Sequence, residues 1–228
     1  MDNTVIHFKN VTLSASFSAK GLMARIGTAA ASLGNRDGLL WNTGVRIIRY
    51  DDFSLDKGKC IALCGNDHFV QDTLLDMITN QKNPATGEIE INGILSSAKQ
   101  HRKRLHGRHS AVDLLSRNAF STNKTTLQTS LLIEKILIFS DLLAVGHVKL
   151  NALSFIEKVQ LSTAIALLTE ADGILLESYL FGCQQSMQNK ILDRIHLQKW
   201  DNKAILIAAP ETEYVRSVAD RYISYKLL

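Results

Sequence analysis

An apolar segment at residues 60–64 runs into Gly65, and a helical pattern of apolar residues follows. A strand, a turn and a helix in this order form the frame of a phosphate-binding loop, which reads GxxxxGK followed by serine or threonine. Gly65 fits the first glycine of that pattern, but Val70 stands at the second glycine, Gln71 at the lysine and Asp72 at the hydroxyl residue. The order of strand, turn and helix is kept, whereas the residues that would bind a phosphate are replaced.

The replaced residues alter the charge that a phosphate would meet. Gln71 is neutral where the pattern has a cation, and Asp72 adds a negative charge. Two unit charges about 4 Å apart interact by about 4 kcal/mol at an effective dielectric constant near 20, so an ionised Asp72 would repel a phosphate. A metal ion that bridges Asp72 and the phosphate would reverse the sign of this interaction. In a purely structural alternative, Gln71 and Asp72 cap the first turn of the helix.

Strands and helices alternate along the rest of the chain. Alternating or fully apolar segments predict strands at residues 5–13, 45–55, 88–92, 110–115, 173–176, 204–209 and 222–228. Helical spacing predicts helices at residues 127–145, 154–167, 186–197 and 211–219. This alternation predicts an α/β fold with a parallel sheet covered on both faces.

Composition narrows the class of protein. The chain has 228 residues, 46% of them hydrophobic and 21% charged, with a formal net charge of +4; such values are ordinary for a globular protein and do not imply a nucleic-acid partner. Cys60, Cys64 and Cys183 lie beside apolar strands, so we expect reduced, buried thiols and a cytosolic compartment. The first residues show no signal sequence, and the most apolar window, 131–145, is shorter than the roughly 20 residues of a membrane-spanning helix.

These pieces, in this order, resemble the nucleotide-binding domain of an ABC transporter ATPase, and the resemblance covers nearly the whole chain. It is carried by the apolar strand and by residues at matching spacings: Gly65, Thr73, Leu74, Leu75, Pro84, Gly87, Ile89, Asn92 and Gly93. The resemblance implies one domain over residues 1–228 with the α/β, P-loop NTPase-like fold of that family. This fold has a mostly parallel sheet, an antiparallel β part and, here, a reduced helical subdomain at about residues 115–168.

Two features resemble one subgroup, the ATPases of capsule, O-antigen and teichoic-acid exporters. They are an insertion before Val45 and the run 179–182 that leads to residues 187–190. The resemblance implies a multi-span membrane permease as partner, and a homodimer or a heterodimer with an intact ATPase. It further implies a cytoplasmic location, peripheral on the inner face of the cell membrane. No nucleic-acid partner is expected, because the net charge of +4 is mild.

The resemblance also implies positions that contact ATP and Mg²⁺. The residues that match nucleotide-binding positions are Phe17, Gly65, Asn66, Asp67, Gln71, Asp72, Thr73 and Ser154. Phe17 stands where an aromatic ring stacks on adenine, with a core phenylalanine as the alternative. Ser154 and Glu157 have the S-x-x-E spacing of a helix capping box, which is an alternative role for Ser154. Phe155 and Ile156 replace glycines of the signature segment, so bulky groups stand where a phosphate would approach the backbone.

The matching catalytic positions are altered as well. Where the family ends a buried strand in Asp-Glu, this chain has Glu177 and Ser178, so one of the two carboxylates is missing. If Mg²⁺ is bound, Asp72 and Glu177 are the candidate metal ligands; a solvated glutamate at a strand end is the alternative. Pro210 stands at the place of the switch histidine and cannot donate a hydrogen bond or shuttle a proton. The glutamine that links nucleotide to transporter would fall near residues 113–114, where there is none.

These changes together predict that ATP hydrolysis is impaired or absent. The sequence therefore favours a degenerate ATP-binding subunit of a polysaccharide export system. One alternative is a non-transport scaffold or regulatory protein that keeps the fold, and another is a residual ATPase that holds a metal between Asp72 and Glu177. The basic run 99–109 could meet anionic lipid or nucleic acid; it lacks interleaved aromatic residues for base stacking, which favours a solvated loop.

Overall fold

The computed structural model describes residues 3–16, 45–50, 52–65, 68–79, 83–119, 125–210 and 212–227. Three of the predicted site residues, Phe17, Asn66 and Asp67, lie outside these ranges, as does the insertion at 18–44.

Nine strands among the described residues form one sheet in the order β3-β1-β2-β9-β4-β8-β7-β6, with β5 paired to β1. Their bounds are β1 Thr4–Ser16, β2 Val45–Tyr50, β3 Phe53–Asp56, β4 Cys60–Cys64, β5 Thr86–Ile91, β6 Leu95–Ser97, β7 Gly173–Leu176, β8 Ala204–Ala209 and β9 Arg221–Leu227. Strands β9, β4, β8, β7 and β6 are parallel neighbours, whereas β1 pairs antiparallel with β2, β3 and β5. The predicted α/β fold with a parallel sheet and an antiparallel part is confirmed.

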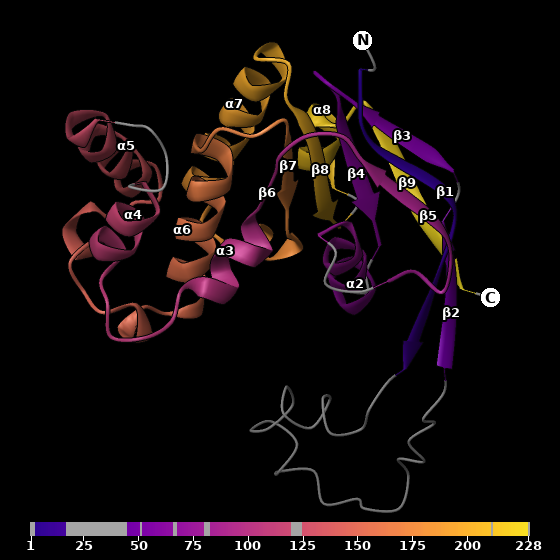
Figure 1. Ribbon diagram of the computed structural model, residues 1–228, viewed down its shortest axis with the longest axis horizontal. Coiled ribbons are helices and arrows are strands. Elements are labelled where there is room, and N and C mark those ends of the chain that lie inside the picture. Colours follow the sequence, from indigo (N-terminus) through magenta and orange to yellow (C-terminus); the bar gives the residue numbers. More distant parts are fainter. Residues whose placement is uncertain are drawn as a thin grey trace, which may run out of the picture.

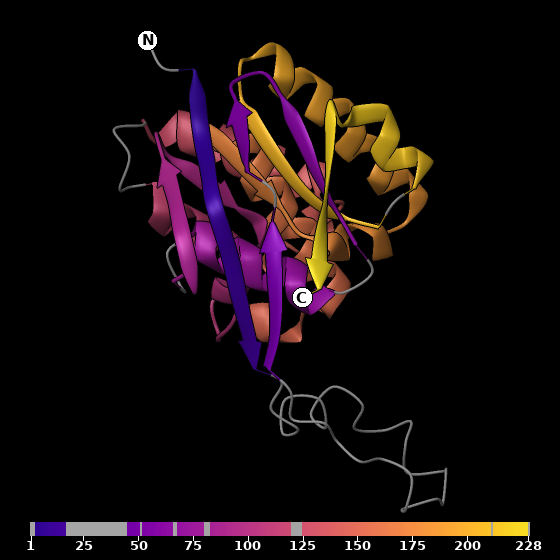
Figure 2. The same ribbon diagram turned by 90° about the vertical axis from the view of Figure 1, so that its right-hand side faces the viewer.

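Helices cover this sheet and extend beyond it. The α-helices are α2 His68–Ile78, α3 Ala98–Arg104, α4 Ala111–Ala119, α5 Thr126–Phe139, α6 Phe155–Leu168, α7 Gln185–Trp200 and α8 Glu213–Val218, and the 3₁₀ helices are η2 Leu143–Val145, η3 Leu150–Ala152 and η4 Ser178–Gly182. In Figure 1, α6 and α7 lie beside the parallel strands, and α4 and α5 lie farthest from the sheet. Figure 2 views the antiparallel strands from the front, with helices behind them. Among the described residues, no helix combines the length and the apolar character needed to cross a membrane.

Strand β4 shows how the sequence builds a core on each face of the sheet. All of its residues are buried, and successive side chains point to opposite faces. Ile61 and Leu63 pack with α2 and the antiparallel strands, whereas Cys60, Ala62 and Cys64 pack with α6, α7 and α8. A third cluster joins α4, α5 and α6 away from the sheet. Because both faces of β4 are covered, the strand is continuously apolar in sequence.

The sequence-based expectations for segment 110–115 and for the basic run are wrong. Segment 110–115 is not a strand, because Ser110 and Asp113 cap the start of α4. The Ser110 backbone N–H donates to the Asp113 carboxylate at 3.0 Å, and the Asp113 N–H donates to the Ser110 hydroxyl at 3.1 Å. The basic run does not form a loop throughout, because its first half is α3. Ser97 caps that helix by accepting a hydrogen bond from the Gln100 N–H.

Candidate functional site

The parallel strands end at one edge of the sheet, and several of the predicted site residues follow directly after these strands. Strand β4 leads into Gly65, β7 into Glu177 and β8 into Pro210, while β6 leads directly into α3. Ligands of open α/β sheets bind at this carboxyl edge. Gly65, Ser178 and Pro210, which are far apart in sequence, line one cavity of about 400 Å³. The structure thus brings these three predicted site residues together.

The wall of this cavity is mainly apolar. The other lining residues are Phe155, Ile156, Tyr179, Phe181 and Gly182. The rings of Phe155 and Tyr179 meet edge to face, with their centroids 5.1 Å apart. A phosphate chain is held by backbone N–H groups and cations. The side chains that replace the signature glycines therefore give the cavity a character suited to an uncharged group.

Gln71, at the lysine position, is 1% exposed and is bonded to the sheet. Its Nε2 atom donates to the carbonyl oxygens of Leu63 at 3.1 Å, Gly65 at 3.0 Å and Ala209 at 3.0 Å. Its Oε1 atom is buried and makes no hydrogen bond. Gln71 therefore does not cap α2: it ties this helix to the ends of β4 and β8.

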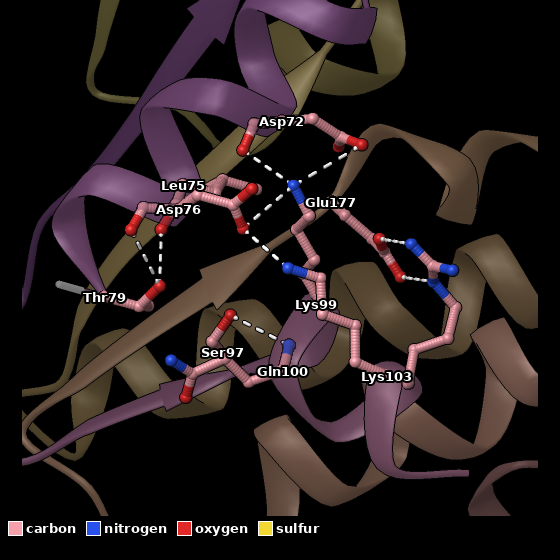
Figure 3. A network of polar contacts seen from close by, with 10 residues as sticks. Asp72, Leu75, Asp76, Thr79, Ser97, Lys99, Gln100, Lys103 and Glu177 are labelled. Carbon is pink, nitrogen blue, oxygen red and sulfur yellow. Dashed lines mark hydrogen bonds and ion pairs between the residues drawn. The ribbon is translucent and has the colours of Figure 1, made fainter. Parts of the chain in front are cut away.

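Asp72, at the hydroxyl position, is paired with a lysine of α3. The Lys99 Nζ atom lies 3.5 Å from Asp72 Oδ2 and 3.1 Å from Asp76 Oδ1, and it donates to the Asp72 carbonyl oxygen at 2.7 Å. Lys103 pairs with Asp76 at 3.0 Å. Figure 3 shows Lys99 between the two aspartates. Because Lys99 is only 5% exposed, its charge is balanced by these carboxylates and not by water.

Glu177 is fully buried and is held by Arg102. The Arg102 Nε atom donates to Glu177 Oε1 at 2.6 Å, and a terminal guanidinium nitrogen donates to Oε2 at 2.8 Å. The guanidinium also lies over the rings of Phe155 and Tyr179, 5.1 and 5.2 Å from their centroids. Burial acts to lower the pKa of Arg102, but the hydrogen bond and charge of Glu177, with smaller effects of Asp72 and Tyr179, raise this pKa above its ordinary value. Glu177 is therefore not a solvated glutamate, since it faces a permanent cation.

Thr73, Ser178 and Ser154 are the remaining predicted residues that the structure describes. Thr73 is 4% exposed and Ser178 is 3% exposed, so both are buried. Ser154 caps α6: its backbone N–H donates to Glu157 Oε2 at 2.7 Å, and the Glu157 N–H donates to its hydroxyl at 3.2 Å. The predicted capping box is confirmed. Ser154 is exposed at this helix end and does not line the cavity.

The described residues do not fit a Mg²⁺ ion with its nucleotide. Both oxygens of Glu177 are bonded to Arg102, and Asp72 Oδ2 faces Lys99. Asp72 Oδ1 is buried without a hydrogen-bond partner, but the other oxygen of this carboxylate faces the Lys99 ammonium group, so a divalent cation there would be repelled by a neighbouring positive charge. No group of three or more metal-binding side chains occurs in the described part of the chain. The candidate ligands Asp72 and Glu177 therefore already have cationic partners within the protein.

Lys99 and Arg102 are the important residues that sequence reasoning missed. Their spacing of three residues places them on one face of a helix, which is the signal that could have indicated a shared role. Their partners lie 27 and 75 residues away along the chain, so sequence alone does not identify them.

Comparison with known proteins adds to this geometry. No family model matches the chain. Among curated proteins, the O-antigen export system ATP-binding protein RfbB of Myxococcus xanthus is 22% identical over 176 residues, which is 77% of this chain and 40% of that protein. The chain thus spans less than half the length of the curated relative that it matches.

Solved structures match more of the chain. The ATP binding subunit of an ABC transporter has a TM-score of 0.69 at 15% identity, over 97% of this chain and 85% of that one. The cbiO1 protein of Clostridium perfringens, part of the ABC transporter complex cbiONQ, has a TM-score of 0.64 at 12% identity, over 100% of this chain and 88% of that one. The chain has the ABC ATPase fold. Gly65, Glu177 and Pro210, three of the positions predicted from the resemblance, follow strands at the carboxyl edge of this sheet, whereas Ser154 lies outside the cavity there.

Proposed function

We propose that the chain is an ATP-binding-type subunit of a surface polysaccharide export system that does not hydrolyse ATP. The observation that carries this proposal is the buried, bidentate pair of Glu177 with Arg102 at the position of the catalytic acids. The ABC ATPase fold and the similarity to an O-antigen export protein support the transport part of the proposal.

In the proposed role, the subunit keeps the fold of an ATP-binding subunit but does not turn over ATP. General-base activation of water needs a carboxylate within hydrogen-bond reach of that water. Both carboxylate oxygens of Glu177 accept hydrogen bonds from Arg102. Ser178 and Pro210 have neither a carboxylate nor an imidazole. The chain would then contribute its shape to a complex, with an intact ATPase supplying turnover in a heterodimer, on the cytoplasmic face of the membrane.

Hydrolysis is tested with the purified chain. Phosphate release from Mg-ATP is expected to equal that of a preparation carrying Ser178→Ala, because Ser178 takes no part in turnover. Turnover well above background that Glu177→Gln abolishes would contradict the proposal, since it would assign Glu177 a catalytic role.

The partner is tested by affinity purification of the tagged chain from membranes solubilised in mild detergent. We expect a multi-span permease, together with a second ATP-binding subunit, to co-purify. Recovery from the soluble fraction alone, with soluble partners alone, would refute the transport role and favour a scaffold or regulatory protein with the same fold.

A further inference from the structure

Helix α3 and the segment that follows it carry both buried and exposed positive charges. Lys99 is 5% exposed and Arg102 is half-buried, and both face carboxylates of neighbouring elements. Arg104 and Arg108, by contrast, are exposed. We infer that α3 is a built-in electrostatic lock: Lys99 and Arg102 supply from within the chain the positive charge that a divalent cation would bring, and thereby keep the site closed to metal-bound nucleotide. This inference rests on the proposed function and deepens it.

The charges at this site balance without any ligand. Glu177, Asp72 and Asp76 are the carboxylates, and Arg102, Lys99 and Lys103 are their cationic partners. Figure 3 shows two sets of contacts beside each other: Lys99 and Lys103 with Asp72 and Asp76, and Glu177 with its guanidinium partner. A divalent cation would have to displace an ammonium or a guanidinium group from its partners, at the cost of leaving that group partly buried and unpaired. The lock therefore acts by competition for the same oxygens.

The position of α3 is fixed by contacts on several sides. Ser97 caps its start, at the end of strand β6. Lys99 holds it to the carbonyl oxygen of Asp72 in α2, and Arg102 lies over the rings of Phe155 in α6 and Tyr179 in η4. These ring contacts and the bidentate ion pair with Glu177 hold the Arg102 guanidinium in one orientation. The lock is consequently part of the folded core and does not depend on a loop that swings into place.

The lock is tested by titrating the full chain with Mn²⁺ alone, with free Mn²⁺ followed by electron paramagnetic resonance. Wild-type protein is expected to bind no Mn²⁺ below about 1 mM. The Lys99→Met/Arg102→Met variant is expected to bind at least tenfold more tightly, because it frees Asp72 and Glu177 and leaves Asp76 paired with Lys103 alone. The matched control, Arg104→Met/Arg108→Met, removes the same charge from exposed positions and is expected to bind as the wild type does.

Two results would overturn the lock. One is a folded Lys99→Met/Arg102→Met variant that binds Mn²⁺ no more tightly than the wild type, and the other is an equal gain in the control. If the double variant does not fold, Lys99→Met alone is titrated; a gain of at least threefold supports the lock and no gain overturns it. Because these titrations involve no permease, loss of the proposed partner leaves their outcome unaffected, and failure of the lock leaves the co-purification result standing.

Discussion

Replacing Arg102 by methionine should destabilise the protein far more than an exposed substitution on the same helix. Methionine keeps an apolar side chain beside Phe155 and Tyr179 but leaves Glu177, which is 0% exposed, without its counter-charge. Removing one partner of a buried ion pair costs about 3–5 kcal/mol. The same loss is expected for Glu177→Met, because it leaves Arg102 unpaired.

The double variant Arg102→Met/Glu177→Met distinguishes an ion pair from simple packing. Two apolar residues that replace a buried pair are often close to neutral, so the double variant should lose about 2 kcal/mol or less. Because each single loss is about 3 kcal/mol or more, the coupling energy in a double-mutant cycle of urea unfolding should be at least about 4 kcal/mol. Arg104→Met, an exposed substitution on the same helix, should stay within about 0.5 kcal/mol of the wild type. Additive losses, with a coupling energy below about 0.5 kcal/mol, would refute the assignment of Arg102 as the counter-charge of Glu177.

Three further outcomes are expected. Gln71→Leu should lose about 2 kcal/mol in urea unfolding, because leucine cannot donate to the three carbonyl oxygens that Gln71 Nε2 meets; a loss below about 0.5 kcal/mol would contradict this. Burial, with a smaller effect of the charge of Arg104, lowers the pKa of His101 to about 4. The unfolded chain protonates His101 near pH 6.5, whereas the folded chain does so only near pH 4. The free energy of unfolding should therefore fall between about pH 6.5 and 4, by at most about 3 kcal/mol. A His101→Gln variant with the pH profile of the wild type would contradict this assignment. Burial raises the pKa of Cys60 to about 12 and that of Cys183 to about 11. A thiol reagent at pH 8 should therefore label these residues in urea but not in the folded protein. Rapid labelling of the folded protein would contradict this prediction.

Local patterns in the sequence were enough to predict the frame of the fold. The buried strands β7 and β8 were predicted with their exact limits, because fully apolar runs of this length occur where a parallel sheet is covered on both faces. The start of α6 was predicted because Ser154 and Glu157 satisfy each other's N–H groups within one turn.

Helices α3 and α4 were not predicted, for different physical reasons. Helix α3 has 7 residues and few apolar side chains, so its helical state depends on ion pairs with Asp72, Asp76 and Glu177 in other elements. The start of α4 carries a signal, the reciprocal cap of Ser110 and Asp113, but the short segment 110–115 by itself favours a strand only weakly, and the cap decides for a helix. The candidate site followed the same rule: the sequence predicted which residues stand at the catalytic positions, and tertiary contacts determined what they pair with.

Calorimetric titration of the wild-type chain with Mg-ATP tests most directly whether Lys99 and Arg102 already balance the charges of the carboxylates at this site. With Glu177 held by Arg102 and Asp72 by Lys99, no binding is expected up to about 1 mM nucleotide. Binding in the micromolar range that requires Mg²⁺ and is lost in Glu177→Gln would contradict the account, because it would show that these carboxylates still serve a metal-bound nucleotide.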